Sequence, residues 1–203
     1  MAKVLVIRLS AIGDVAMTVP VIYSAAKANP EDSFTVLTQA FLMPLFMNRP
    51  PNVEVIGINT KGAEKGLIGL LKFISALLKF DFDVILDLHN VIRTIIICTF
   101  FRLNGKRVFV LDKARKERKR LTAIKGKRLY PLRPVIVRYA DVFRAAGLNY
   151  TETFTSLYEE SPAELSGMAS VAGIKKGKWI GVAPFAKHRV PAFVPRRCWE
   201  PPA

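Results

Sequence analysis

The chain has 203 residues, of which 51% are hydrophobic, and it carries a formal net charge of +15. This length and apolar content suffice for one large domain with a substantial core. Cys98 and Cys198 provide neither metal-ligand spacing nor a disulfide framework. No apolar run reaches the roughly 18 residues that span a bilayer, and residues 3–9 are too short for a signal peptide. We therefore expect a soluble protein of a reducing cytosol.

Short β-branched or apolar runs alternate along the chain with segments of helical periodicity. The predicted strands are residues 3–7, 33–38, 53–58, 83–87, 107–111 and 177–184. The predicted helices are residues 15–28, 40–47, 67–78, 94–101 and 134–146, with another helix start at 161–164. Strands that alternate with helices in this way predict an α/β fold, a doubly wound, Rossmann-like parallel sheet.

The first strand leads into the turn Arg8-Leu9-Ser10-Ala11-Ile12-Gly13-Asp14. In an open α/β sheet such a turn lies at the carboxyl edge, where ligands bind. Gly13 allows a close backbone approach or a positive φ, and the free N–H groups of the helix start attract anions. Asp14 has two interpretations that remain open at this point. It caps the helix and complements the helix dipole, or it is a general base beside a hydroxyl that must lose a proton.

The opening of the chain reads Val4-Leu5-Val6-Ile7-Arg8-Leu9-Ser10-Ala11-Ile12-Gly13-Asp14-Val15-Ala16-Met17-Thr18-Val19-Pro20. This run closely resembles the start of glycosyltransferase family 9, the ADP-heptose:lipopolysaccharide heptosyltransferases. That family begins with a strand, an Arg-Leu-Ser-x-x-Gly-Asp turn and a helix that carries Thr-x-Pro. The resemblance implies the GT-B arrangement of two facing Rossmann-like domains, with the sugar acceptor on the N-terminal domain and the nucleotide-sugar donor on the C-terminal domain.

By this resemblance, Asp14 is the catalytic base, and Ser10 and Gly13 are acceptor-binding residues. The implied reaction moves a heptose or a related sugar from an ADP-sugar to the lipopolysaccharide inner core, with inversion at the anomeric carbon. No metal or other cofactor is expected. The implied partners are the nucleotide-sugar donor, a lipopolysaccharide core or lipid A-linked acceptor, and an anionic membrane surface. The implied location is peripheral, on the cytoplasmic face of the bacterial inner membrane.

Polar side chains also follow the predicted strand 83–87. Asp87 and Asn90 could cap the next helix, and His89 could be a hydrogen-bonded structural residue. In the family, a similar Asp-x-(Gln or His)-x-x-x-(Arg or Lys) segment lies against the acceptor groove. The resemblance therefore makes Asp87, His89 and Arg93 acceptor-side candidates. The guanidinium fork of Arg93 would suit a carboxylate or a phosphate of the acceptor.

Basic residues are concentrated between positions 102 and 128, where only Asp112 and Glu117 oppose them. This run is a solvated flexible loop, a nucleic-acid-binding segment, or a docking segment for an anionic membrane or acceptor. No aromatic residue lies between Leu111 and Leu129, so a platform for stacking bases is missing and nucleic acid is the less favoured partner. The residues assigned to the acceptor side are Lys113, Arg115, Lys116, Arg118, Lys119 and Arg120.

Residues 179–188 resemble the first strand and loop of the family's donor domain, with Lys187 as a remnant of its phosphate loop. The tail at 189–203 contains four prolines, which cannot form the helix that should follow. We expect a reading-frame shift or gene interruption near His188. The predicted organisation is an acceptor domain at 1–160, a linker and incomplete donor domain at 161–188, and an aberrant tail at 189–203. Such a chain would be inactive alone; the alternative is a basic α/β module that binds nucleic acid or another polyanion without catalysis.

Overall fold

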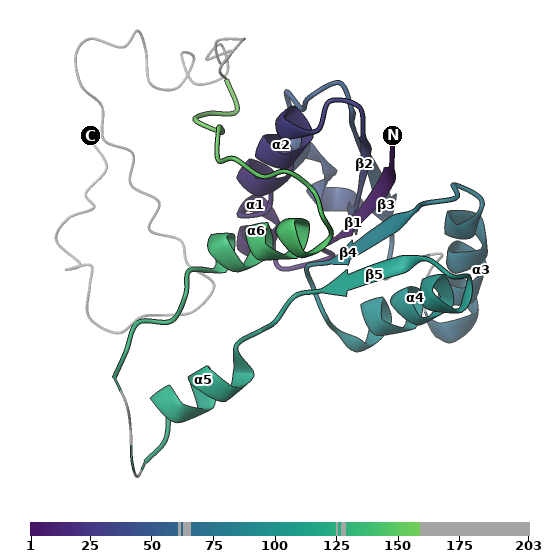
Figure 1. Ribbon diagram of the computed structural model, residues 1–203. Coiled ribbons are helices and arrows are strands. Elements are labelled where there is room, and N and C mark those ends of the chain that lie inside the picture. Colours follow the sequence, from purple (N-terminus) through teal and green to yellow (C-terminus); the bar gives the residue numbers. More distant parts are fainter. Residues whose placement is uncertain (61, 63–65, 125, 127–128, 159–203) are drawn as a thin grey trace, which may run out of the picture. The chain divides into compact units, whose positions relative to one another are not determined.

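The computed structural model describes residues 1–60, 62, 66–124, 126 and 129–158, which form a five-stranded parallel sheet in the order β3-β2-β1-β4-β5 (Figure 1). The strands are β1 (Lys3–Ile7), β2 (Ser33–Gln39), β3 (Val53–Ile58), β4 (Val84–Asp87) and β5 (Arg107–Val110). The first strand of the chain lies at the centre of the sheet, between β2 and β4. The predicted parallel α/β fold is confirmed, whereas the strand at 177–184 and the helix start at 161–164 lie outside the described residues.

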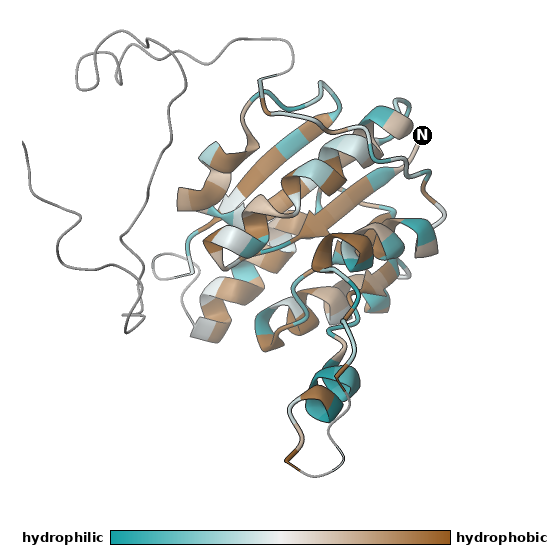
Figure 2. Ribbon diagram, turned by 90° about the vertical axis from the view of Figure 1, so that its left-hand side faces the viewer, coloured by the Kyte–Doolittle hydropathy of each residue, from teal (hydrophilic) through white to brown (hydrophobic). Residues whose placement is uncertain are grey.

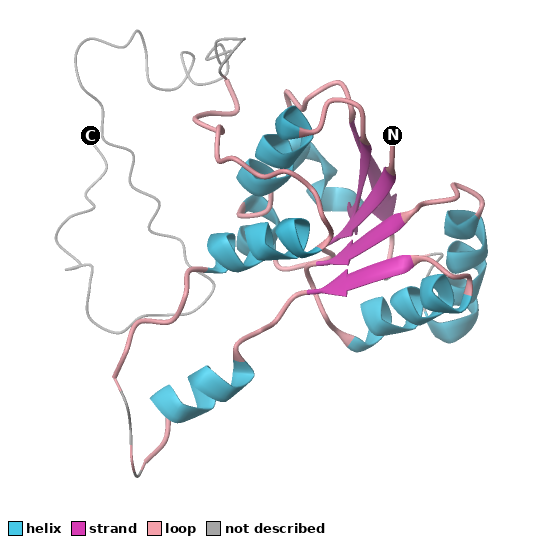
Figure 3. Cartoon of the chain, in the orientation of Figure 1, coloured by secondary structure: helices cyan, strands magenta, loops and turns pink. Residues whose placement is uncertain are grey.

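The helices differ from the prediction at two places (Figure 3). They are α1 (Ile12–Ala16), α2 (Val19–Ala28), the 3₁₀ helix η1 (Ala40–Phe46), α3 (Gly66–Leu78), α4 (Ile92–Leu103), α5 (Arg115–Leu121) and α6 (Val135–Ala145). The single helix predicted for 15–28 is two helices, because Pro20 has no N–H to donate and lies in the first turn of α2. The basic run, for which a flexible loop was one interpretation, contains the short helix α5.

Helices cover both faces of the sheet, as the doubly wound prediction requires. The central strand shows why, because Val4 and Val6 pack on one face while Leu5 and Ile7 pack on the other, all fully buried. Side chains of α2 and α6 join the first of these cores, and side chains of α3 and α4 join the second. Apolar residues run through the strands in Figure 2, whereas α5 is mostly hydrophilic.

The strand register brings several loops to one place. Ile7 pairs with Leu37 and Asp87, and Asp87 pairs with Val110, so β1, β2, β4 and β5 end side by side. The turn after β1, the polar segment after β4 and the basic run after β5 therefore all begin at the carboxyl edge of the sheet. This edge is where open α/β sheets bind ligands. Within the described part of the chain, no helix has the length and apolar character needed to cross a bilayer.

Candidate functional site

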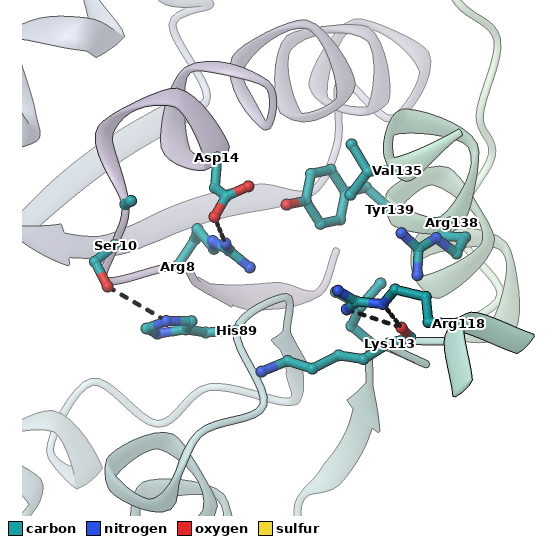
Figure 4. Close-up of a pocket in the computed structure, with 11 residues that line it drawn as sticks. Arg8, Ser10, Asp14, His89, Lys113, Arg118, Val135, Arg138 and Tyr139 are labelled. Carbon is teal, nitrogen blue, oxygen red and sulfur yellow. Dashed lines mark hydrogen bonds and ion pairs between the residues drawn. The ribbon is translucent and has the colours of Figure 1, made fainter. Parts of the chain in front are cut away.

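A cavity of about 470 Å³ opens at the carboxyl edge (Figure 4). Its walls come from the turn after β1, the segment after β4, the basic run after β5 and one side of α6. The lining residues are Arg8, Ser10, Ala11, Asp14, His89, Leu111, Lys113, Arg118, Val135, Arg138 and Tyr139. The structure thus brings together five of the residues predicted for the site: Ser10, Asp14, His89, Lys113 and Arg118.

Asp14 is the carboxylate of this cavity. It is the third residue of α1, whose N-cap is Ala11, and no side chain caps the helix. Asp14 therefore does not cap the helix, but it lies in the first turn of α1, where its charge complements the helix dipole as the first interpretation also proposed. One carboxylate oxygen forms an ion pair with Arg8, and no described residue is hydrogen-bonded to the other oxygen. The Asp14 side chain is 41% exposed, so this second oxygen is open to a ligand in the cavity.

Arg8 holds Asp14 in place and was not recognised as a site residue in the sequence. Its side chain is only 8% exposed, and it donates a 2.6 Å hydrogen bond to the carbonyl of Leu88. The guanidinium also lies over the Tyr139 ring, 5.9 Å from the ring centroid. Three contacts from different parts of the chain therefore fix the cation that orients the Asp14 carboxylate. The feature of the sequence that could have identified Arg8 is a positively charged residue directly after a fully buried strand.

Helix α6 supplies three further lining residues that the sequence analysis did not identify: Val135, Arg138 and Tyr139. Tyr139 is fully buried, and its hydroxyl has no hydrogen-bond partner among the residues that the structure describes; the same holds for the buried Nε of Arg138. Burial raises the pKa of Tyr139, so its hydroxyl keeps its proton at neutral pH. Buried polar atoms are normally hydrogen-bonded. Unpaired polar atoms around a cavity of this size are consistent with a polar ligand that completes their bonding.

His89 joins the cavity from the segment after β4. Its Nε2 lies 3.4 Å from the Ser10 hydroxyl, and its buried Nδ1 has no partner in the described part of the chain. Burial, with smaller contributions from the positive charges of Arg8 and Lys113, lowers the pKa of His89 to about 4. His89 is therefore neutral at pH 7 and a weak base there. Asp14 differs from His89 in carrying a negative charge on a partly exposed side chain that lines the cavity.

The lowered pKa of His89 predicts a pH dependence of stability. Between pH 6.5 and about pH 4 the unfolded chain binds a proton that the folded chain does not bind, so acidification favours unfolding. From about pH 7.5 to about pH 5, this should remove about 1 kcal/mol, after a discount for the partial exposure of the ring. Urea unfolding at both pH values should show the difference in the wild type and lose it in His89→Gln. An equal pH dependence in the two proteins would contradict the assignment.

Asp87 and Arg93 do not line the cavity. Asp87 is fully buried, and its Oδ1 accepts bonds from the backbone N–H groups of His89 (2.9 Å) and Asn90 (2.8 Å). Its Oδ2 accepts a 2.8 Å bond from the Thr94 hydroxyl. These bonds shape the loop that carries His89 and the start of α4. The geometry therefore supports the structural interpretation of Asp87, whose carboxylate is closed to an acceptor.

Gly13 was expected to provide close backbone approach or a positive φ. Its φ lies outside the left-handed region, so the positive-φ alternative is wrong. A Cβ built at Gly13 would meet no atom within 4 Å, and the residue is exposed. The first turn of α1 is therefore open to a ligand beside Asp14.

The basic run divides between the cavity and the surface. Lys113 and Arg118 line the cavity, and the Arg118 guanidinium donates to the Lys113 carbonyl at 3.2 and 3.3 Å. Burial and neighbouring Arg residues, Arg115 foremost, lower the pKa of Lys113. The remaining members do not line the cavity: Arg115, Lys116, Lys119 and Arg120. The donor-side candidate Lys187 lies outside the described residues.

The charged side chains around the cavity indicate which ionic groups its ligand carries. Arg8, Lys113, Arg118 and Arg138 oppose the single carboxylate of Asp14. This excess of positive charge favours a ligand with phosphate or carboxylate groups. Among the residues that the structure describes, no group of His, Cys, Asp and Glu side chains is arranged to hold a metal ion.

Comparison with known proteins finds similar folds among solved structures. No family model matches the sequence, and no curated protein matches it either. Among solved structures, a glycosyl transferase family 9 protein from Veillonella parvula DSM 2008 superposes with a TM-score of 0.60 at 19% identity, covering 86% of this chain and 51% of that one. The E. coli heptosyltransferase WaaC with ADP gives a TM-score of 0.51 at 22% identity, covering 76% and 49%.

WaaC with ADP-2-deoxy-2-fluoro heptose gives a TM-score of 0.51 at 21% identity and covers 76% of this chain and 50% of that one. The chain thus spans about half the length of the solved structures it matches. At these identities the likeness establishes the fold. The described chain therefore has the Rossmann-like α/β fold found in about one half of a family 9 glycosyltransferase structure.

Proposed function

We propose that this chain belongs to glycosyltransferase family 9 and supplies the acceptor side of a transferase. The reaction moves a heptose or a related sugar from an ADP-sugar to the lipopolysaccharide inner core. One observation carries the proposal: the Asp14 carboxylate, in the turn that resembles the family, lies in a cation-lined cavity at the carboxyl edge, and one of its oxygens is bonded to no described residue. The likeness to family 9 structures supports it at the level of the fold.

The proposed chemistry is an inverting displacement with Asp14 as general base. The unpaired oxygen of Asp14 accepts the proton of an acceptor hydroxyl as that hydroxyl oxygen bonds to the anomeric carbon of the donor sugar. The bond between the anomeric carbon and the diphosphate breaks at the same time, and the diphosphate leaves with its electron pair. Arg8 keeps the carboxylate in one orientation during this step, because the ion pair and the Leu88 hydrogen bond restrain the guanidinium.

The acceptor in this proposal is an anionic saccharide. Lys113, Arg118 and Arg138 surround the part of the cavity that faces Asp14, and each can bind a phosphate or carboxylate oxygen (Figure 4). A lipid A-linked lipopolysaccharide core carries groups of this kind. An acceptor held by these cations would place a neighbouring hydroxyl at the free oxygen of Asp14.

The donor in this proposal is a nucleotide sugar. The WaaC structures contain ADP or a fluorinated heptose analogue of its sugar nucleotide, which supports a donor of this class. A leaving diphosphate requires preorganised positive groups, which we place on the donor side, with Lys187 as a remnant of its phosphate loop. Reaction with a lipid-linked acceptor would take place on the cytoplasmic face of the bacterial inner membrane.

Acceptor binding can be tested with this chain directly. A soluble, deacylated inner-core saccharide that carries phosphate and carboxylate groups should bind the wild type in a calorimetric titration. Lys113→Gln should weaken binding about tenfold, because it removes one charge-assisted hydrogen bond in the cavity. Lys116→Gln is the matched control, since Lys116 lies on α5 outside the cavity and should bind as the wild type does.

Two outcomes of this titration would contradict the acceptor site. The first is an equal loss in both lysine variants, which would mean diffuse electrostatic attraction rather than a site. The second is equally tight binding of a random oligonucleotide with the same sensitivity to salt. That result would favour the non-catalytic polyanion-binding module.

A further inference from the structure

Tyr139 combines a place in the hydrophobic core with a polar group at the cavity. It lies on the face of α6 that packs on the sheet, and its side chain is fully buried in the core that α2 and α6 share. Phe143, one turn later on the same face, is also fully buried but carries no polar atom. Packing therefore explains the ring of Tyr139, whereas its hydroxyl requires another explanation.

The Tyr139 hydroxyl lacks a hydrogen bond in the unliganded protein. Its oxygen is buried, and no side chain or backbone group within the described ranges is bonded to it. A buried hydroxyl in this state lowers stability, because it has given up its hydrogen bonds to water without replacing them. Such groups are uncommon in folded proteins and indicate a role. Since Tyr139 lines the cavity, a bound ligand can supply the missing partner.

The neighbours of the ring fix the direction of this hydroxyl. The Arg8 guanidinium lies 5.9 Å from the ring centroid, and the ring packs in the core beneath α6. Figure 4 shows the hydroxyl on the side of the ring that faces Asp14. Burial is the main cause of the raised pKa of Tyr139, and the negative charge of Asp14 adds to it while Arg8 opposes it. The hydroxyl is therefore a hydrogen-bond donor near the carboxylate.

The charge of Asp14 determines which kind of ligand oxygen fits beside this donor. A phosphate or carboxylate oxygen at this place would be repelled by the Asp14 carboxylate. A neutral hydroxyl is not repelled, and it can donate one hydrogen bond and accept others. Asp14 provides an acceptor oxygen and Tyr139 provides a donor. The pair therefore complements two neighbouring hydroxyl groups of a saccharide.

We propose that Tyr139 determines acceptor specificity by donating a hydrogen bond to a neutral hydroxyl next to the one that Asp14 deprotonates. The inference deepens the proposed function and rests on it for the saccharide acceptor. The cavity then has two parts. Lys113, Arg118 and Arg138 bind the anionic groups of the acceptor, whereas Asp14 and Tyr139 bind its adjacent hydroxyls. An anion without such hydroxyls gains only from the first part.

Tyr139→Phe tests the inference, because it removes the hydroxyl and keeps the ring beside Arg8. In calorimetric titrations of the full 203-residue chain, the variant should bind the deacylated inner-core saccharide about fivefold more weakly than the wild type does. Inorganic pyrophosphate, an anion without a neutral hydroxyl on carbon, should bind both proteins alike. Urea unfolding should show no loss of stability in Tyr139→Phe, because the deleted hydroxyl has no partner in the described part of the free protein.

Tyr23→Phe is the matched control. Tyr23 on α2 is also buried, but its hydroxyl donates a 2.9 Å hydrogen bond to the carbonyl of Met47. It does not line the cavity. Tyr23→Phe should therefore lower the folding equilibrium constant about fivefold and leave saccharide binding unchanged. The two variants thus have opposite expected effects, since one loses binding and keeps stability while the other loses stability and keeps binding.

Three results would overturn the inference alone. The first is wild-type saccharide binding by Tyr139→Phe while Lys113→Gln still binds more weakly, which would leave the proposed function in place. The second is an equal loss of pyrophosphate binding in Tyr139→Phe, which would assign the hydroxyl to the anionic groups. The third is a loss of stability as large as that of Tyr23→Phe, which would mean that the hydroxyl is already bonded in the free protein. Failure of the wild type to bind the saccharide would instead contradict the proposed function, and this inference with it.

Discussion

Replacing Asp14 by Asn should lower the turnover number of sugar transfer by about 10²- to 10⁴-fold, in a transferase that joins this acceptor side to a donor side. The amide has the shape of the carboxylate but cannot accept the hydroxyl proton. The substitution should change kcat much more than KM, because proton transfer contributes in the transition state and little to acceptor binding. Release of ADP from the sugar nucleotide, measured at several acceptor concentrations, separates the two constants.

Asp81→Asn is the matched control for this experiment. Asp81 is also an ion-paired carboxylate, with the Lys106 ammonium 2.6 Å away, but it precedes β4 and does not line the cavity. The control should keep wild-type turnover. The Arg8 side chain retains its bond to Leu88 in Asp14→Asn, so the thermal transition should show a folded protein. Wild-type turnover in folded Asp14→Asn would remove Asp14 from the role of base.

Replacing Asp87 by Ala should reduce the free energy of unfolding by about 3–5 kcal/mol. The carboxylate is fully buried and accepts bonds from two backbone N–H groups and the Thr94 hydroxyl. Alanine would leave the N–H groups of His89 and Asn90 without this partner beneath the sheet edge. It would also release Asn90 from the turn, where this residue has a φ of 51°. Urea unfolding at neutral pH measures the loss.

Asp83 provides the comparison for Asp87, because it lies just before the same strand. It is exposed and accepts one 2.8 Å bond from the backbone N–H of Lys3. Asp83→Ala should therefore cost about 1 kcal/mol or less. Should Asp87→Ala fail to fold, Asp87→Asn retains an acceptor oxygen and should give an intermediate loss. A cost for Asp87→Ala no larger than that for Asp83→Ala would contradict the structural role.

The sheet could be predicted because each of its strands is determined by residues that are adjacent in the sequence. Each strand is a short run of β-branched and apolar residues, and the helices between strands impose parallel pairing. The place of Asp14 followed from the same logic, since a turn after the central strand must lie at the carboxyl edge. Pro20 could have predicted the break between α1 and α2, because proline starts helices more readily than it continues them.

The rest of the site could not be predicted, because it depends on contacts between distant parts of the chain. Arg8 and Tyr139 are separated by 131 positions in the chain and come into contact only once α6 covers the sheet. Helix α5 buries no side chain, so it has no apolar periodicity to reveal it. Asp87 was ambiguous because a carboxylate after a strand can face a ligand or fold inward to bond its own loop. The burial of the Asp87 carboxylate decides between these two orientations, and burial depends on tertiary packing that the local sequence does not reveal.

The contact between Arg8 and Asp14 has a consequence for the charge balance of the proposed reaction. At rest the guanidinium and the carboxylate neutralise each other inside the cavity wall. Once the carboxylate takes the hydroxyl proton, Arg8 has lost its counter-charge, and the wall becomes one unit more positive. In the same step the departing diphosphate gains negative charge. The proton transfer thus makes the cavity wall more positive in the same step in which the diphosphate becomes more negative. In the proposed reaction, the buried Arg8 therefore links bond formation at the acceptor to bond breaking at the donor.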